Sequence, residues 1–255
     1  MRKPASDADA ADTSDGTLYD RMLVNLLGSW TRIAEGTGGA SIERFPGAAV
    51  AVFPAGPERL FYNNAVLARD LNGSRAREAA AAAVRIYEGA GVDRYAIWAH
   101  ESEQAANAEL TRRGFRVDTT TRAMAMPLDE IAVPRPEIEL GPPDWNEYLR
   151  IIEVPDELLA GVDGSHFHIL VARLDGENAA AGMAYDHDGD CGIYNVGTLP
   201  HARRRGLGTA LTGLLLYQAR ERGCATASLQ STEIAEGVYA ALGFRDLGRF
   251  IEYVK

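Results

Sequence analysis

The stretch HARRRGLGTAL, residues 201–211, places three arginines and two glycines directly before an apolar run. Upstream of it, the β-rich run Gly192–Thr198 is followed by Pro200, which lacks the N–H that a sheet ladder needs. Downstream, apolar residues recur at helical spacing over Leu207–Arg222, and a glycine ends the pattern. We therefore predict a loop that joins a strand to the N-terminus of an amphipathic helix.

A loop in this position can serve as an anion site. The first turn of a helix exposes unpaired N–H groups and the positive end of the helix dipole. Gly206 and Gly208 would let an anion approach the backbone, and the arginines would add charge-assisted hydrogen bonds. The competing interpretation is a solvated run of arginines. A P-loop is excluded because Thr209-Ala210 follows the second glycine, and a dinucleotide fingerprint is excluded because Leu211 replaces its third glycine.

Two motifs in this order, separated by a helix and a strand, resemble the GNAT acetyltransferase superfamily. Residues 203–208, RRRGLG, match its acyl-CoA loop R/Q-x-x-G-x-G/A. Residues 239–244, YAALGF, match the Y-x-x-x-G-F pattern that ends its next helix. The resemblance covers residues 166–246 and implies an acyl-CoA-dependent N-acyltransferase that moves acetyl from acetyl-CoA to a primary amine by direct attack.

The resemblance also implies roles for single residues. Tyr239 would protonate the departing thiolate; the competing interpretation is a half-buried helix aromatic. Backbone groups at the end of the Gly192–Thr198 strand would bond the pantetheine arm of the donor, and the arginine-glycine loop would hold its pyrophosphate. The Thr232 hydroxyl would stand where many members have asparagine. The implied donor-binding residues are Val196, Gly197, Thr198, Arg203, Arg204, Arg205, Gly206, Leu207, Gly208, Thr209 and Thr232.

The general base remains unassigned. Ala227 occupies the strand position where some members carry a glutamate, and Asp190 stands near where others place an acid. A hairpin-turn aspartate is the simpler interpretation of Asp190, because Asp188-Gly189 marks a turn just before it. The missing base keeps a second hypothesis open, in which the chain is a non-catalytic acyl-CoA-binding or sensing protein.

The first half of the chain repeats the order of the second without its chemistry. A Gly-Phe pair follows a helix at 114–115 and again at 243–244, which indicates an internal duplication. Leu110 stands where the second copy has its tyrosine, and NGSR at 72–75 replaces the arginine-glycine motif. Glu78 would add negative charge in the first helical turn. We expect no acyl-CoA site in this half, which would instead shape the acceptor pocket.

The expected fold class is α/β (α+β), with two tandem GNAT-like lobes, each a mixed, mostly antiparallel sheet flanked by helices. The expected divisions are a disordered acidic tail at 1–16, a degenerate lobe at 17–130, a proline-rich linker at 131–143 and the catalytic domain at 144–255. Helices are expected at 17–35, 74–88, 104–113, 207–222 and 233–242. Strands are expected at 48–53, 59–62, 94–100, 167–174, 179–185, 192–198 and 224–230, the first two as a hairpin.

The amino-acid composition limits the classes of molecule that this protein can bind. A formal net charge of -10 argues against a nucleic-acid partner, and no apolar run is long enough for a membrane span. We expect a cytoplasmic monomer or homodimer that acts on a small-molecule amine, with Cys191 and Cys224 as reduced, inert thiols. No metal is expected: the DHDGD run at 186–190 has Gly197 at position twelve, where a calcium loop needs glutamate.

Overall fold

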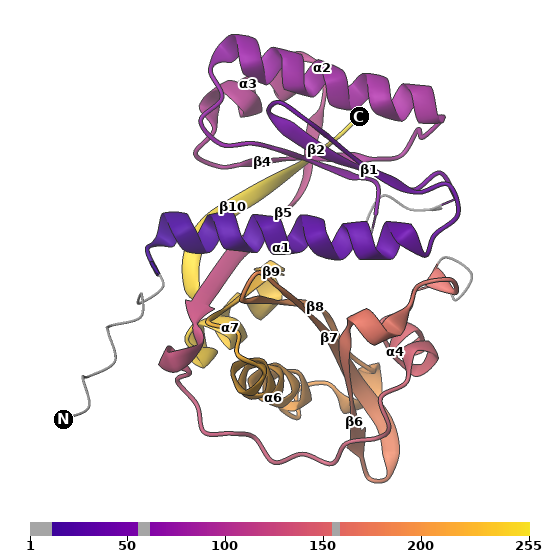
Figure 1. Cartoon of the computed structure of the whole chain (residues 1–255), viewed down its shortest axis with the longest axis vertical. Helices are drawn as coiled ribbons and strands as arrows, with labels where there is room; N and C mark the ends of the chain where they lie inside the picture. The colour runs from indigo at the N-terminus through magenta and orange to yellow at the C-terminus, as the bar shows by residue number, and fades with distance from the viewer. Residues whose placement is uncertain (1–11, 56–61, 155–158) are drawn as a thin grey trace, which may run out of the picture.

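The structure is a computed structural model that describes residues 12–55, 62–154 and 159–255 (Figure 1). In these residues the strands form one sheet of ten, in the order β1-β2-β3-β4-β10-β5-β9-β8-β7-β6. The strands are β1 (Ser41–Phe45), β2 (Ala48–Val52), β3 (Asn64–Leu67), β4 (Ala96–His100), β5 (Arg116–Pro127), β6 (His168–Leu174), β7 (Glu177–His187), β8 (Asp190–Thr198), β9 (Thr226–Ser231) and β10 (Arg245–Val254). The α-helices are α1 (Asp15–Glu35), α2 (Gly73–Ala90), α3 (Gln104–Arg112), α4 (Trp145–Ile151), α6 (Leu207–Arg222) and α7 (Glu236–Leu242). Short 3-10 turns are η1 (Leu128–Glu130), η2 (Gly164–His166), η3 (Pro200–Ala202) and η4 (Glu233–Ala235).

The two halves of the chain repeat one topology. Strands β1, β2 and β3 form an antiparallel meander, and β3 pairs in parallel with β4 after the crossover helix α2. Strands β6, β7 and β8 form a second meander, and β8 pairs in parallel with β9 after α6. Each half then has a shorter helix and a long strand. We call β1–β4 with α2 and α3 the N-terminal lobe, and β6–β9 with α4, α6 and α7 the C-terminal lobe.

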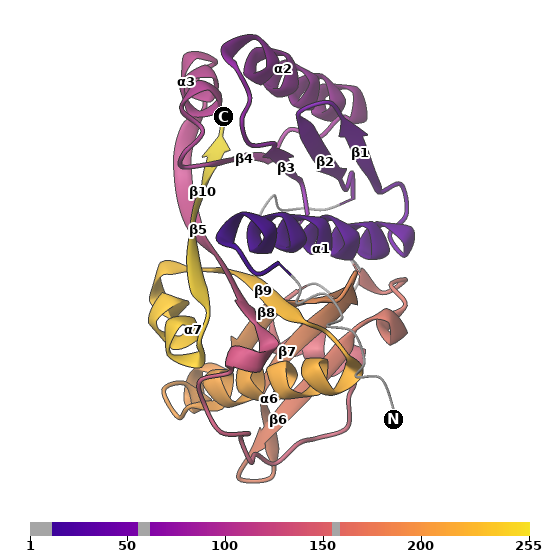
Figure 2. The same cartoon turned by 60° about the vertical axis from the view of Figure 1, so that its left-hand side comes forward.

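The prediction of a separate sheet in each lobe is wrong, because β5 and β10 join the lobes into one sheet. Strand β10 is antiparallel to both β4 and β5, and Glu252 faces Trp98 on one side and Thr119 on the other. The far part of β5 pairs with β9, from Arg122↔Ser231 onward. Both strands are long enough to extend from one lobe into the other, as Figure 2 shows. The last strand of the second repeat thus completes the sheet of the first.

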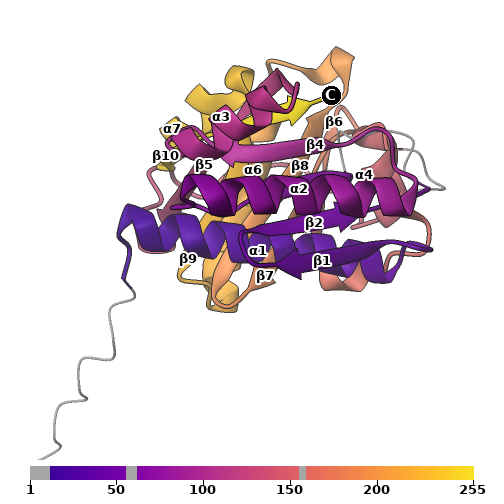
Figure 3. The ribbon, with the colours of Figure 1, turned by 90° about the horizontal axis from the view of Figure 1, so that it is seen from above.

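Helix α1 lies across the junction of the lobes and contacts both (Figure 1). Seen from above, its axis runs in nearly the same direction as that of α2 (Figure 3). The Ser14 side chain caps its N-terminus by accepting from the Thr17 N–H. Toward the N-terminal lobe, Trp30 packs edge to face on Trp98, with ring centroids 5.8 Å apart. Toward the C-terminal lobe, the buried Asn25 amide donates to the carbonyls of Tyr185 and Asp190, at 3.0 and 2.9 Å. The helix therefore belongs to neither lobe alone, although its sequence position assigned it to the first.

The structure confirms most of the expected elements, with shifts of a few residues at their ends. Helix α6 has the expected bounds, 207–222, because its capping glycine and apolar face are local signals. The expected strand at 59–62 lies largely outside the described residues, and the antiparallel partner of β2 on that side is β3. Of the expected tail, residues 1–11 lie outside the described part, and α1 already begins at Asp15. Strands β1, β3, β5 and β10 and helix α4 were not predicted.

The proline-rich segment at 131–143 lies along α6. The Tyr217 hydroxyl donates to the Val133 carbonyl at 2.8 Å. A Cβ on Gly213 would come within 2.9 Å of Pro136, so the missing side chain lets the segment approach the helix closely. An isolated bridge pairs Leu140 with Ala172 on the edge strand β6. No helix in the described residues has the length and apolar content that crossing a bilayer requires.

Candidate active site

Strands β8 and β9 separate halfway along β8. Their parallel pairing runs only from Asp190↔Thr226 to Gly192↔Ser228, whereas β8 stays paired with β7 as far as Thr198. A bulge in β8 accompanies the separation: the register against β7 shifts between residues 181 and 183, and Asn195 has a φ of 49°. From residue 193 onward, the edge of β8 that faces β9 therefore makes no ladder with β9.

The arginine-glycine loop closes back on the end of β8. The Arg203 Nε donates to the Thr198 carbonyl at 3.1 Å. Gly206, with φ of 81°, is the N-cap residue of α6, and no side chain caps this helix. A Cβ on Gly208 would lie 3.8 Å from the Thr198 Oγ1 and 3.9 Å from the Val196 Cγ1, so loop and strand are in near contact.

The start of α6 has free donors at the surface. Its first helical hydrogen bond runs from the Ala210 N–H to the Gly206 carbonyl at 2.9 Å, so the amides of residues 207–209 precede the ladder. Arg203, Arg204 and Arg205 are all exposed beside them. The backbone here is thus an uncapped helix start whose first amides make no helical hydrogen bond. The arginines differ: Arg203 is bonded to the strand end, and Arg205 lies 3.7 Å from Asp175.

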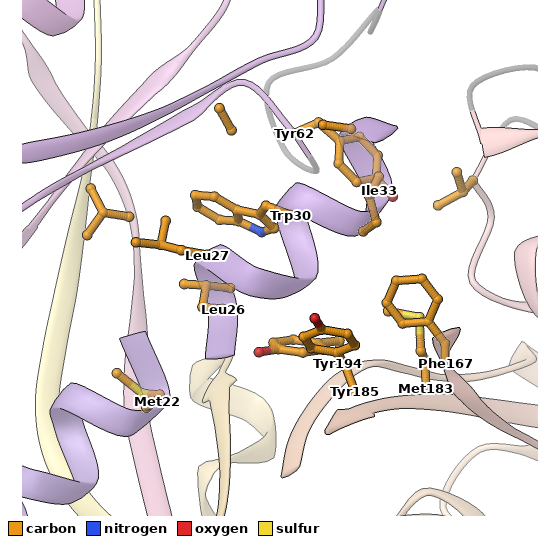
Figure 4. Close-up of a cluster of buried hydrophobic side chains, with 14 of the residues drawn as sticks. Met22, Leu26, Leu27, Trp30, Ile33, Tyr62, Phe167, Met183, Tyr185 and Tyr194 are labelled. Carbon is orange, nitrogen blue, oxygen red and sulfur yellow. The ribbon is translucent and has the colours of Figure 1, made fainter. Parts of the chain in front are cut away.

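A cavity of about 710 Å³ lies between α1 and the sheet, next to this loop. Both lobes, α1, β5 and β10 contribute to its walls. Figure 4 shows the side-chain cluster around α1, with Trp30 and Tyr62 on one side of the helix and Met183, Tyr185 and Tyr194 on the other. Of the side chains predicted for the site, Tyr239, Thr232 and Val196 line the cavity. The cavity and the arginine-glycine loop meet at Val196.

Tyr239 is positioned by α7 and by the core beneath it. Its ring packs edge to face on Phe244, with centroids 5.9 Å apart. Burial raises the pKa of the Tyr239 phenol above its ordinary value, so the hydroxyl stays protonated at neutral pH. A protonated phenol at a cavity wall can donate a proton to a ligand. Gly197 has a packing role besides any ligand contact, because a Cβ there would lie 3.1 Å from the Ile152 side chain of the segment after α4.

The structure does not place Asp190 as a base. Its carboxylate is 1% exposed, does not line the cavity, and accepts from the Thr226 hydroxyl at 2.7 Å and the Ser228 hydroxyl at 2.6 Å. Burial raises its pKa, an effect that the two hydroxyl donors oppose. These contacts tie the β7–β8 turn to β9, so Asp190 has the structural role that its position after a hairpin turn indicated.

The remaining acidic and sulfur groups near that turn form ordinary structural contacts. Asp186 accepts from Arg222 at 2.6 Å and lies 3.2 Å from the His168 Nε2, and these two groups hold its pKa low. Burial raises the pKa of the Cys191 thiol, and it raises that of Cys224 to about 12. Both cysteines are unpaired and protonated at neutral pH, as predicted for inert thiols.

Sequence reasoning missed most of the polar and aromatic side chains of the cavity, among them Trp30, Trp98, Gln230 and Glu252. Trp98 and Glu252 are 7% and 5% exposed. The only available signal for Glu252 was a charged residue alternating with Phe250 and Val254. It could not be used because that strand was not predicted.

In the N-terminal lobe, the loop that corresponds to the arginine-glycine loop has its backbone N–H donors bonded to side-chain oxygens of the protein. Asp70, three residues before α2, has a φ of 59°, much like the 60° of Arg204, three residues before α6. The Asp70 N–H donates to the Glu103 carboxylate at 2.7 Å. The Asn72 side chain caps α2 by accepting from the Arg75 N–H at 3.0 Å. Carboxylate and amide oxygens of the chain thus take the donors that an anion would need.

Comparison with known proteins agrees with this geometry. Residues 130–244 match the family model described as Acetyltransferase (GNAT) family, whereas no curated protein sequence matches the chain. Among solved structures, a GCN5-related N-acetyltransferase from Kribbella flavida superposes with a TM-score of 0.69, at 18% identity over 92% of this chain and 95% of that one. The corresponding enzyme from Sphaerobacter thermophilus gives 0.60, at 17% identity over 92% and 91%. A tandem GNAT protein from the clavulanic acid biosynthesis pathway gives 0.53, at 14% identity over 92% and 94%. At these identities the structural matches establish the fold.

Proposed function

We propose that this chain is a GNAT acetyltransferase that transfers acetyl from acetyl-CoA to a primary amine, because residues 130–244 match the acetyltransferase (GNAT) family model. One observation carries the proposal. The unpaired edge of β8 and the phenol of Tyr239 line one cavity, and the uncapped start of α6 lies close to Val196 on that edge. These are the three parts that a thioester donor with a pyrophosphate needs.

The donor would lie along the separated half of β8. Its pantetheine amides would pair with backbone groups of Val196, Gly197 and Thr198, as an added strand does. Its pyrophosphate would accept from the amides of residues 204–209, and the exposed arginines would supply charge. The Thr232 hydroxyl, at the wall of the cavity, would contact the same ligand.

The reaction needs only a free amine, a polarised carbonyl and an acid. The amine nitrogen attacks the thioester carbonyl and forms a C–N bond, while a strand N–H near Val196 stabilises the developing oxyanion. The C–S bond then breaks, and the Tyr239 hydroxyl protonates the thiolate. The nitrogen releases one proton and the phenolate regains one, so the protons balance. The products are an amide and free CoA.

A thiol-release assay tests this proposal against the alternative of a non-catalytic acyl-CoA sensor. The wild-type protein is incubated with acetyl-CoA and a broad panel of primary amines, and free CoA is measured. We expect release that depends on both the amine and the protein. Acetyl-CoA that binds tightly in calorimetry but is consumed with no amine would support the sensor instead.

We also expect one acetyl-CoA per chain. The loop before α6 has uncapped amides, whereas Glu103 and Asn72 occupy the equivalent donors before α2. Leu110, fully buried, stands where the C-terminal lobe has its tyrosine. Isothermal titration with acetyl-CoA should give a stoichiometry near one, and Glu103→Gln should leave it unchanged because Asn72 still caps the helix. A stoichiometry near two would contradict the assignment of the N-terminal lobe as empty.

A further inference from the structure

Helix α7, which carries Tyr239, is short and is packed into the core mainly at one end. Among its seven residues, Leu242 is the buried one. The Leu242 carbonyl also accepts from the Ala132 N–H at 3.2 Å, so the C-terminal end of the helix is fixed by the core and by the chain beside it. No side chain of the described residues caps the N-terminal end. A short helix is stable only through tertiary contacts, so the end that begins at Glu236 depends on contacts of another kind.

The carboxylate of Glu236 holds that end against two strands. Its Oε2 accepts from the Arg122 Nε of β5 at 2.7 Å. Its Oε1 lies 2.7 Å from the Arg249 Nη2 of β10, as an ion pair without hydrogen-bond alignment. The three side chains are 20–22% exposed, so salt and water screen these pairs less than pairs at an open surface. One carboxylate thus ties α7 to both of the strands that join the lobes, and Figure 2 shows the helix beside them.

The two arginines are arranged so that they need this carboxylate. Arg122 and Arg249 are opposite each other in the register of β5 and β10. Like charges at directly opposed strand positions destabilise a sheet, and a carboxylate bound to both replaces the repulsion with two attractive contacts. Asp246 also pairs with Arg122, and the Arg249 Nη1 donates to the Thr120 hydroxyl at 3.2 Å. Both guanidinium groups are therefore held in place to receive Glu236.

This anchor lies next to Tyr239 on the helix but outside the cavity. Residues three positions apart are neighbours on a helix surface, as Glu236 and Tyr239 are. Tyr239 lines the cavity, whereas Glu236 and its two arginines are not among the described residues that line it. The ion pairs therefore act on a ligand in the cavity chiefly through the placement of the phenol. A displacement of about 1 Å at a reacting group can lower a rate by about a hundredfold.

We propose that Glu236 is a positioning residue which, held by Arg122 and Arg249, fixes the Tyr239 hydroxyl where it can protonate the departing thiolate. The inference rests on the proposed acetyl transfer and adds to it the group that places the acid. It also gives the first half of the chain a part in the reaction, because Arg122 lies on β5, the last strand of the first repeat. The acid of the C-terminal lobe is thus held in part by a strand that the first half supplies.

A double-mutant cycle tests the inference. Glu236→Gln keeps the shape of the side chain and removes the charge that pairs with both arginines. In the wild-type background it should lower kcat at least about tenfold and leave the Kd of acetyl-CoA within about twofold. In the Tyr239→Phe background, where no hydroxyl is left to position, it should change kcat less than about twofold. No loss in the wild-type background, or equal losses in the two backgrounds, would overturn the inference.

The matched control is Glu109→Gln on α3, the helix that corresponds to α7 in the N-terminal lobe. Glu109 likewise pairs with two arginines, Arg112 at 2.7 Å and Arg113 at 2.6 Å, which lie at the end of its own helix. This substitution removes the same charge from the same kind of cluster and should leave kcat unchanged in both backgrounds. A loss of kcat as large as that of Glu236→Gln would mean that the effect is not specific to α7, and would overturn the inference.

A readout without turnover separates this inference from the proposed transfer. The chain has ten tyrosines, and incorporation of 3-fluorotyrosine gives each of them a fluorine NMR signal. The signal that Tyr239→Phe removes is that of Tyr239. Glu236→Gln should shift or broaden this signal, and Glu109→Gln should leave it in place. If no amine is acetylated, the proposed transfer fails on its own. An unchanged Tyr239 signal in Glu236→Gln overturns the positioning role whether or not acetyl transfer is found.

Discussion

Replacing Tyr239 with phenylalanine should lower kcat at least about a hundredfold, the usual contribution of a positioned general acid, while the Kd of acetyl-CoA stays within about twofold. Phenylalanine keeps the ring contact with Phe244 and the packing of α7, so only the hydroxyl is lost. Without it, the thiolate must leave unprotonated or take its proton from water. Steady-state kinetics with a saturating amine and calorimetry with acetyl-CoA measure the two quantities.

A matched control separates this effect from the loss of any tyrosine hydroxyl. Tyr217 donates to the Val133 carbonyl at 2.8 Å, on the outer side of α6 and away from the cavity. Tyr217→Phe should cost about 1 kcal/mol of unfolding free energy and leave kcat unchanged. Equal activity of Tyr239→Phe and wild type would remove Tyr239 from the mechanism.

The pH profile gives a second readout of the same residue. Burial raises the pKa of Tyr239 above the ordinary value of 10.0, and the protonated form is the active one. Activity that depends on this phenol is therefore present below the raised pKa and is lost as the pH rises through it. The wild-type profile should show no descending limb from Tyr239 below about pH 10.

The arginine-glycine loop could be predicted because its determinants are local. A strand, a proline, two glycines and a helical apolar face lie within one short stretch, and helix α6 begins where the glycines indicate. The positive φ of Gly206 is a property that the residue type itself suggests. Arg204 also has a positive φ, which its residue type does not suggest. Asn195 tolerates its positive φ, but an asparagine alone does not mark a bulge.

The cavity wall formed by β4, β5 and β10 could not be predicted because its determinants are not local. Trp30 and Trp98 each have the spacing of core residues, and both are indeed buried. Only the pairing of β10 with β4 places Glu252 beside Trp98. A strand pattern specifies which residues share a face but not which strand lies next to it, and here the neighbour comes from the other repeat. The same limit explains why two sheets were expected where one forms.

In the arginine-glycine loop, we expect backbone amides to contribute more to pyrophosphate binding than the arginine side chains do. Arg203 is bonded to the Thr198 carbonyl and Arg205 lies near Asp175, so these two exposed arginines are already engaged. Exposed ion pairs contribute little, and removing one should weaken acetyl-CoA binding less than about fivefold. The amides at the start of α6 are held in place by the backbone of Gly206. The backbone should therefore matter more than any single arginine.

Gly206→Val is the variant that tests this conclusion, and it should raise the Kd of acetyl-CoA at least about tenfold. The space around Gly206 is open, with no atom within 4 Å of an added Cβ, so crowding within the protein is not the cause. The first cause is the φ of 81°, which costs a β-branched residue about 1–3 kcal/mol. Relief of this strain would shift the amides that follow Gly206. The second cause is the new side chain, which would stand in the path of the anion. Gly206→Asn is the matched control, because asparagine tolerates this φ and should lose less affinity. Calorimetry on both variants and on Arg203→Ala decides the matter: equal losses from Gly206→Val and Arg203→Ala would mean that arginine charge, and not the shape of the backbone, holds the phosphates.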